Sequence, residues 1–453
     1  MAAENYVLLE RIELNASAAS VEFTNIPQSG YTDLKVVVSC RMARATNGGA
    51  LNVNFNGSSA NLTERNMWGN GTSAVSGTDV ALVALVPGAN TTASTFSNFE
   101  LYVPNYTSSN FKSWSVDFTS ENNATAGYDG FVAGLWSQTT AINAIKFIDN
   151  GADNLVQYST FSLYGLAAVG TTPAIAPKAS GGNIDYDGTY WIHTFLTSGT
   201  FTPQTGLSCD YLVVAGGGGG GCSYGGGGGA GGLRSTVTAT GGGGTVETAL
   251  SLGTSAYTVT IGAGGSGGTN GAVSTNGANS VFSTITSTGG GKGADNGGAG
   301  FTSGATGGSG GGANYTNTTG GSGTANQGYA AGNGNASIAA GSGGGGAGAS
   351  SATVTTSGVA TNGGAGVATS INGSSVTYAG GGGGGATIGG GAGTTAGTGG
   401  TGGGGAGSKD VGGSGTSGTT NTGGGGGGSG YFNTTGAGGN GGSGIVIIRY
   451  LAA

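Results

Sequence analysis

A tract that is almost pure glycine constrains this chain more than any other feature. It begins with YLVVAGGGGGGCSYGGGGGAGG at Tyr211 and continues, with short interruptions, to residue 444. Glycine loses more conformational freedom on folding than any other residue, so such a tract stays disordered unless dense hydrogen bonding offsets the lost entropy. Of the 109 glycines, 19 lie in residues 1–209 and the other 90 follow, whereas all six prolines precede residue 204. The sequence therefore joins two different materials near residue 205.

Charge and cysteine content narrow the classes of partner and cofactor. The net charge of −7 argues against nucleic acid, because a phosphate-binding surface needs clustered lysine and arginine. Cys40, Cys209 and Cys222 are too few for a disulfide framework, and their spacing is a poor zinc signature. We therefore expect plain thiols, with no metal and no cofactor. The N-terminus lacks the features of a secretory signal, and no stretch approaches about 20 apolar residues, so we expect synthesis in the cytoplasm without membrane insertion.

Residues 1–169 alternate between apolar and polar side chains. In LNVNFNG, which begins at Leu51, the apolar residues point one way and the asparagines the other, and LKVVVSCRM and WSVDF behave in the same way. A period of two, with turn residues between short segments, is typical of antiparallel strands that bury one face. About eight such strands predict an all-β domain, an antiparallel β-sandwich of the jelly-roll type. Residues 170–183, rich in proline, alanine and glycine, are predicted to be a linker.

Two strand-like segments bracket the glycine-rich tract. DYLVVA (210–215) precedes it, and GIVIIRY (444–450) follows it directly. Both segments are short apolar runs of the kind that forms buried strands. We predict that they are neighbours in a small framing sheet built from residues 184–215 and 445–451, so that the two ends of the tract are held together by apolar side chains.

His193 is the only histidine of the chain. It shares a predicted strand face with Trp191 and Phe195. With no second histidine or cysteine to complete a metal site, it is interpreted as a packed structural side chain rather than as a ligand or a catalytic base.

Four structures compete for residues 216–444. Collagen needs a strict Gly-X-Y period with abundant proline, and calcium-binding nonapeptide repeats need a recurring aspartate, so both fail. Disorder is the usual outcome for a chain rich in glycine and serine, but strand-like islands such as AYTVTIGAGG interrupt this one. The fourth structure is a bundle of extended glycine runs in a polyproline-II-like conformation, with three residues per turn. Because such a backbone has no internal hydrogen bonds, closely packed runs would bond to one another. We predict this bundle.

The sequence YDGTYWIHTFLTSGTFTP…LSCDYLVVAGGGGGG…YTVTIGAGGSGG…GGSGIVIIRY resembles the glycine-rich domain of bacteriophage tail-fibre and adhesin proteins. The resemblance covers about residues 184–450 of the predicted glycine-rich domain, 184–453. The front domain, with ASVEFTNIPQSGYTDLKVVVSCR, resembles the β-sandwich modules of phage tail fibres. The resemblance implies a virion appendage with a polyglycine-II-like region that reads host receptors through its loops. This chain differs from the best-known of these adhesins in carrying its own sandwich domain.

Motif matches inside the glycine tract carry little weight, because in a segment so rich in glycine they arise by chance. Residues 264–268, GGSGG, fit the G-x-S-x-G pattern, but a nucleophile elbow also needs a following helix and an acid and a histidine within reach. Lys292 in GGGKGAD lacks the following serine or threonine of a P-loop. We therefore expect no catalytic residues and no enzymatic activity.

Aromatic residues in the polar loops between glycine runs are the candidates for receptor contact. Such side chains suit sugar faces and protein surfaces, although they could instead stack on the glycine backbone and cover it. The candidates are Tyr315, Tyr329, Tyr431 and Phe432, with hydrogen bonds from Asn314, Asn317, Asn326 and Asn433.

Together these observations lead us to expect a non-enzymatic phage tail-fibre or adhesin component that attaches to the host cell surface. Its partners would be a host surface glycan or outer-membrane protein and other virion tail proteins, and analogy with tail fibres suggests a homotrimer. It would act outside the cell, in the virion tail. The alternatives are a bacterial extracellular fibre-forming protein, disfavoured by the missing signal, and a carbohydrate-degrading enzyme, disfavoured because the glycine half lacks clustered carboxylates.

Overall fold

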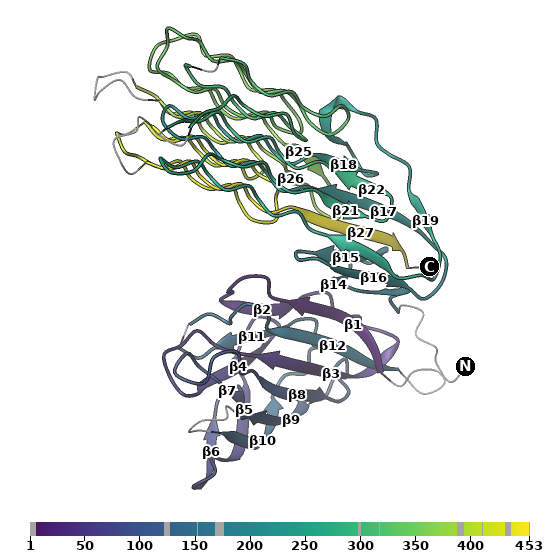
Figure 1. Ribbon diagram of the computed structural model, residues 1–453. Coiled ribbons are helices and arrows are strands. Elements are labelled where there is room, and N and C mark those ends of the chain that lie inside the picture. The colour runs from purple at the N-terminus through teal and green to yellow at the C-terminus, as the bar shows by residue number, and fades with distance from the viewer. Residues whose placement is uncertain are drawn as a thin grey trace. The chain divides into compact units, whose positions relative to one another are not determined.

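The computed structural model consists almost entirely of strands and extended chain (Figure 1). It describes residues 6–121, 127–151, 153–167, 176–297, 300–316, 318–386, 394–409, 411–430 and 436–452, in which one short 3₁₀ turn, η1 (Gly241–Gly243), is the sole helical element. The chain divides into two compact units: the first is Met1–Lys178, Gly182–Trp191 and Leu451–Ala453, and the second is Ala179–Gly181 and Ile192–Tyr450. The expectation of an all-β protein with antiparallel sheets is confirmed.

Two antiparallel sheets make up the first unit. The larger has the order β6 (Ala74–Asp79), β5 (Leu62–Gly69), β10 (Tyr128–Trp136), β9 (Lys112–Ser120), β8 (Ser97–Val103), β3 (Tyr31–Cys40), β12 (Thr160–Ala167), β1 (Tyr6–Glu13) and β14 (Asn183–Tyr186). The smaller has the order β2 (Ser20–Phe23), β11 (Ile145–Asp149), β4 (Gly49–Phe55) and β7 (Leu82–Val86).

The strand count of the first unit differs from the sequence expectation. The described part of residues 6–167 holds twelve strands, β1 to β12, rather than about eight. The strands β2 and β6 show why the alternating pattern did not predict every strand. The first has only four residues, and the second lies at the edge of its sheet and buries none of its side chains. Neither therefore displays a long alternating pattern.

One hydrophobic core of the first unit draws side chains from both of its sheets. The ring of Phe147 on β11 packs against Phe99 of β8 and Phe161 of β12, with ring centroids 5.8 and 5.4 Å apart. All three side chains are buried, as are the alternate residues of β4 and β9. In strands such as β4 and β9, the alternation predicted from the sequence therefore decides which face enters this core.

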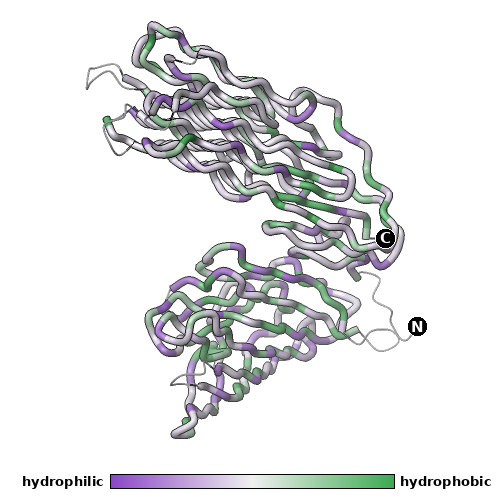
Figure 2. Tube along the Cα trace, viewed as in Figure 1, coloured by the Kyte–Doolittle hydropathy of each residue, from purple (hydrophilic) through white to green (hydrophobic). Residues whose placement is uncertain are grey.

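Short strands frame the glycine tract in the second unit. They are β13 (Ala179–Ser180), β15 (Tyr190–Phe195), β16 (Gly199–Pro203), β17 (Leu207–Val214), β18 (Leu233–Ser235), β19 (Leu250–Leu252), β20 (Tyr257–Thr260), β21 (Ser280–Phe282), β22 (Ile285–Ser287), β23 (Asn296–Gly297), β24 (Gly300–Phe301), β25 (Val367–Thr369), β26 (Val376–Tyr378) and β27 (Ile445–Leu451). The strands β17 and β27 pair antiparallel, with Leu212 opposite Ile447. The predicted pairing of DYLVVA with GIVIIRY is thus confirmed. Figure 2 shows these two strands as the most apolar part of the unit.

Part of the predicted linker, 170–183, belongs to a strand pair. Ala179 and Ser180 of β13 lie opposite Pro203 and Thr202 of β16. Residues 170–175 of the linker lie outside the described residues. Strand pairing therefore holds the backbone of residues 179–180, although the composition of the linker gives no sign of it.

Between β17 and β27 the chain runs back and forth in extended glycine-rich segments, which Figure 1 shows lying side by side. The first such run, residues 216–221, leaves β17, and the next, 225–232, returns to β18. The backbone N–H groups of run 216–221 donate to three neighbouring runs in turn, and the partner run repeats every three residues. The pairs are Gly216 to Ala278, Gly217 to Gly442, Gly218 to Gly229, Gly219 to Thr275, Gly220 to Gly439 and Gly221 to Gly226, at 2.8–3.0 Å.

The carbonyl groups of the same run accept from three further runs with the same period. The donors are Gly290 to Gly216, Gly265 to Gly217, Gly426 to Gly218, Gly293 to Gly219, Gly268 to Gly220 and Ser429 to Gly221, again at 2.8–3.0 Å. Run 216–221 therefore has six neighbours, and each of its residues makes two backbone hydrogen bonds. This density of bonding is what offsets the entropy lost by ordering glycine.

Glycine is required in this run because the neighbouring backbones leave no room for a side chain. A Cβ atom placed at any of residues 216–221 would lie 1.9–2.2 Å from a carbonyl oxygen of another run. Real Cβ atoms do not approach backbone oxygen so closely. Packing against six neighbouring runs therefore requires the unbroken glycine sequence of this run.

Candidate functional site

The turns between glycine runs at the end of the second unit opposite β17 and β27 meet one another. Tyr224 N–H donates to Gly430 O at 3.1 Å, and Asn296 N–H donates to Cys222 O at 3.0 Å. The rings of Tyr224 and Tyr315 pack edge to face, with centroids 5.0 Å apart. We call this the turn end, defined by residues 222–224, 296, 315 and 430. It gathers residues from four separate segments of the sequence.

Two of the predicted contact residues lie at the turn end. Tyr315 is half-buried against Tyr224, so part of its ring faces solvent. Asn314 is fully buried, and its Oδ1 accepts hydrogen bonds from the N–H and hydroxyl of Thr316, both at 3.0 Å. The amide of Asn314 therefore shapes the turn that carries Tyr315 and is not presented to solvent.

Four of the predicted contact residues lie outside the described residues. They are Asn317, Tyr431, Phe432 and Asn433. Gly430 belongs to the turn end, and Thr316 lies next to it, with its hydroxyl 3.5 Å from Asn296 Oδ1.

Tyr329 and Asn326 lie elsewhere, beside the framing strands. Leu233 N–H in β18 donates to Gln327 O at 3.0 Å, which places the turn 324–327 next to that strand. The hydroxyl of Tyr329 lies against Gly243, where a Cβ atom would be 2.6 Å from it. The structure therefore does not bring Tyr315 and Tyr329 together, because the run 318–324 between them carries the chain from the turn end back to the framing strands.

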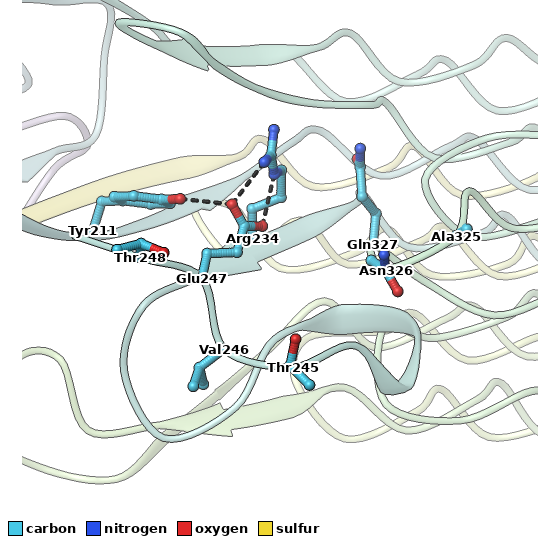
Figure 3. Close-up of a pocket in the computed structure, with 9 residues that line it drawn as sticks. All are labelled: Tyr211, Arg234, Thr245, Val246, Glu247, Thr248, Ala325, Asn326 and Gln327. Atoms are coloured by element: carbon cyan, nitrogen blue, oxygen red, sulfur yellow. Dashed lines mark hydrogen bonds and ion pairs between the residues drawn. The ribbon is translucent and has the colours of Figure 1, made fainter. Parts of the chain in front are cut away.

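A cavity of about 680 Å³ opens beside the turn 324–327 (Figure 3). Its polar lining includes Tyr211 from β17, Arg234 from β18 and Glu247. The Glu247 carboxylate accepts from the Tyr211 hydroxyl at 2.6 Å and from Arg234 Nε and Nη2 at 2.8 and 2.6 Å. Asn326 lines the same cavity and is exposed.

The electrostatics of this cavity explain why Glu247 and Arg234 are present in a tract with so few charges. The hydrogen bonds that Arg234 donates to the Glu247 carboxylate raise the pKa of Arg234, and burial, followed by the bond to Glu247, raises the pKa of the Tyr211 hydroxyl. Both oxygens of the carboxylate are engaged, so Glu247 ties β17, β18 and its own loop together. The scarcity of charge between residues 235 and 448 is the sequence signal that could have found this cluster.

His193 is buried and holds two segments of the framing region together. Its Nδ1 lies 2.7 Å from Gly181 O, and its Nε2 lies 3.0 Å from the Tyr450 hydroxyl. Burial lowers the pKa of the imidazole to about 4, so it is neutral near pH 7. The interpretation of His193 as a structural side chain is confirmed.

Within the described ranges, no group of three or more His, Cys, Asp or Glu residues is arranged to hold a metal ion. All three cysteines are buried thiols, as expected. Burial raises the pKa of both Cys40 and Cys209 to about 12, which keeps these thiols protonated. No helix among the described residues has the length and apolar character needed to cross a membrane.

Comparison with known proteins identifies the second unit. No curated protein and no solved structure matches the chain. Residues 195–451 match the family model of a glycine-rich domain. This match spans more than half of the 453 residues and contains the runs and the framing strands β17 and β27. The chain therefore belongs to the glycine-rich domain family.

Proposed function

We propose that this chain is a component of a phage tail fibre or adhesin and attaches the virion to the host cell surface without enzymatic activity. The observation that carries the proposal is the side-chain-free interior of the second unit, in which run 216–221 is bonded to six neighbours. Such an interior is rigid, but it has no side chains with which to recognise a partner. It is suited to holding a set of turns in fixed positions, and turns are the parts of a scaffold that tolerate sequence change and carry recognition.

The proposal includes a finer description of both units. The three-residue period of hydrogen bonds in run 216–221 supports a polyglycine-II bundle, because polyproline-II-type chains have three residues per turn and no internal hydrogen bonds. The ring contacts of Phe147 across the core support a β-sandwich for the first unit, with two sheets packed face to face.

Receptor contact is assigned to the turn end. Tyr315 presents part of an aromatic ring there on a turn fixed by Asn314. An aromatic ring amid serine, threonine and asparagine suits either a sugar face or a protein surface. The partner in this proposal is a host surface glycan or outer-membrane protein. Other tail proteins would hold the chain in the virion, where assembly as a homotrimer follows by analogy with tail fibres.

The location of the protein in the virion is tested first. Gold-labelled antibodies against the purified chain are expected to decorate the tail region of phage particles in electron micrographs. Particles without the chain, or label confined to the surface of the producing bacterium, would contradict the proposal in favour of a bacterial surface fibre.

Substitution of Tyr315 by alanine tests the turn end. We expect about tenfold weaker binding to host cells, because a partly exposed aromatic ring at a binding surface contributes on the order of 1–2 kcal/mol. Binding of fluorescently labelled protein to host cells gives the measurement. Tyr329→Ala is the matched control, since Tyr329 lies beside the framing strands, and it should bind within twofold of the parent. Equal binding by the parent and Tyr315→Ala would move the recognition surface away from this residue.

A further inference from the structure

The outer face of the larger sheet in the first unit carries a row of side chains that the host-attachment proposal does not use. Phe131 on β10 is 60 % exposed and lies directly opposite Met67 on β5, which is 58 % exposed. On its other side Phe131 lies opposite Asp117 of β9, and Asp117 lies opposite Glu100 of β8. Because residues opposite each other in neighbouring strands share a face, these four side chains form one row across four strands.

The next row of the same face has small side chains in the middle and large ones at its ends. Ala133 on β10 and Ser115 on β9 lie opposite each other, with Arg65 beyond Ala133 and Tyr102 beyond Ser115. The two small side chains leave a hollow of about 520 Å³ beside Phe131, and all four residues line it. This volume falls within the roughly 300–1,000 Å³ of typical small-molecule sites.

A second hollow lies on the other side of the first row. It has a volume of about 290 Å³, and Gly69, Ala74 and Asp129 are among the residues that line it. Phe131 and Asp117 line both hollows, and so does Met67. The row is therefore a ridge with an aromatic ring and a carboxylate side by side along its crest.

The carboxylate of Asp117 has no partner within the described part of the chain, in contrast to the acidic groups around it. Glu100 pairs with Lys35 at 2.6 Å, and Asp129 accepts a hydrogen bond from Thr119. No described residue donates a hydrogen bond to Asp117 or forms an ion pair with it. Its two oxygens, which together can accept about four hydrogen bonds, stand open beside the exposed ring of Phe131.

We propose that this ridge binds a neutral sugar of a glycan chain. The apolar C–H face of a pyranose ring packs on Phe131, and two adjacent sugar hydroxyls donate to the Asp117 carboxylate. Arg65, Tyr102 and Ser115 surround the hollow in which the neighbouring sugar lies. The acidic groups Asp117, Glu100 and Asp129 disfavour anionic sugars, since like charges repel across a shared surface.

A protein partner fits this face less well than a sugar. Surfaces that bind proteins usually present a contiguous apolar patch of several hundred Å² and lose charged residues from their centre. Here the exposed large apolar side chains are Phe131 with Met67 and, beyond Ala133 on the same strand, Leu135, and a charged carboxylate stands at the centre of the ridge. An aromatic ring beside an open hydrogen-bond acceptor matches the alternating C–H and hydroxyl surface of a sugar.

Saturation-transfer NMR with the full chain tests the site. The probes are methyl β-glucoside, methyl β-galactoside, N-acetylglucosamine and N-acetylgalactosamine, with glucuronate as the anionic comparison. We expect magnetisation transfer to the ring protons of at least one neutral sugar and none to glucuronate. A titration of the sugar that binds then gives its Kd.

Two substitutions and one matched control decide the outcome. Phe131→Ala and Asp117→Ala are each expected to raise the Kd at least tenfold. Phe111→Ala is the control, since Phe111 is 56 % exposed but lies outside both hollows, and its Kd should stay within twofold of the parent. Unchanged tryptophan fluorescence shows that each variant is folded.

Three results would overturn the sugar site: no transfer to any neutral probe, unchanged affinity in Phe131→Ala, or concentration-dependent self-association that Phe131→Ala abolishes, which would assign the ridge to a second copy of the chain. The site is independent of the proposed turn-end recognition. Its failure would leave the effect of Tyr315→Ala on host-cell binding unchanged.

Discussion

Replacing Gly220 by alanine is expected to destabilise the second unit by at least about 3 kcal/mol. A Cβ atom at this position would lie 2.0 Å from Gly427 O and 2.5 Å from the carbonyl carbon of the same residue. Overpacking a well-filled interior costs about 1–3 kcal/mol when side chains can adjust, and more when they cannot. Here the obstructing atoms are backbone, which is itself bonded to further runs, so relief requires moving several runs at once.

Calorimetry of the full chain measures this effect. Trp68, Trp114 and Trp136 lie on strands of the first unit, whereas Trp191 lies on β15, whose residues are divided between the two units. In a Trp191→Phe background, the transition that leaves tryptophan fluorescence unchanged is therefore the unfolding of the second unit. A loss of 3 kcal/mol should lower its midpoint by roughly 6–12 °C.

Gly271→Ala is the matched control for Gly220→Ala. No heavy atom lies within 4 Å of a Cβ placed at Gly271, and its φ is not in the left-handed region. Its transition should stay within about 2 °C of the parent. Equal midpoints for the two variants would show that the runs are packed far more loosely than their hydrogen bonds indicate.

Acid is expected to destabilise the second unit by about 3 kcal/mol through His193 alone. The folded protein keeps this imidazole neutral down to its pKa of about 4, whereas in the unfolded chain it takes up a proton near pH 6.5. Between these values the unfolded state binds more protons, so stability is fully present above pH 6.5 and is lost as the pH falls toward 4. The difference between a pKa of about 6.5 in the unfolded chain and about 4 in the folded protein corresponds to this free energy, at about 1.4 kcal/mol for each tenfold change in proton affinity.

The variant His193→Gln isolates this contribution. It removes the only imidazole of the chain, so no other histidine can produce the same pH dependence. The midpoint of the second unit, followed by calorimetry from pH 7.5 to pH 4, should fall more steeply in the parent than in the variant. Parallel pH profiles would show that the folded protein lets solvent protonate His193.

The pairing of the two strands that frame the glycine-rich tract was predictable because their side chains encode it. The apolar runs of β17 and β27 need burial, and each lies at one end of a tract that has no other long apolar segment. The alternation in residues 1–169 likewise fixed which side chains enter the first core. Where a strand buries nothing, as in β6, the same reasoning had no signal to use.

The neighbours of each glycine run could not be predicted, because glycine carries no side chain that distinguishes one run from another. The positions of Tyr315 and Tyr329 illustrate the consequence. Both residues lie in polar loops that follow glycine-rich runs, yet the two loops lie at opposite ends of the runs. The number of chain reversals before each loop decides at which end it lies. The cavity beside Glu247 could not be predicted for a related reason. Part of its lining comes from turn 324–327, which lies far from Glu247 in the sequence.

The period of the hydrogen bonds limits how this chain can change in length during evolution. Each residue of run 216–221 points its N–H at one of three neighbours, and the direction recurs after three residues. Inserting one or two residues within a run would turn every later donor toward the wrong neighbour, whereas three residues restore the direction and, in the proposed polyglycine-II conformation, add about 9 Å. Two runs joined by a turn must also lengthen together. Insertions and deletions in natural variants should therefore come in multiples of three and in pairs across a turn, while the turns themselves are free to vary in length.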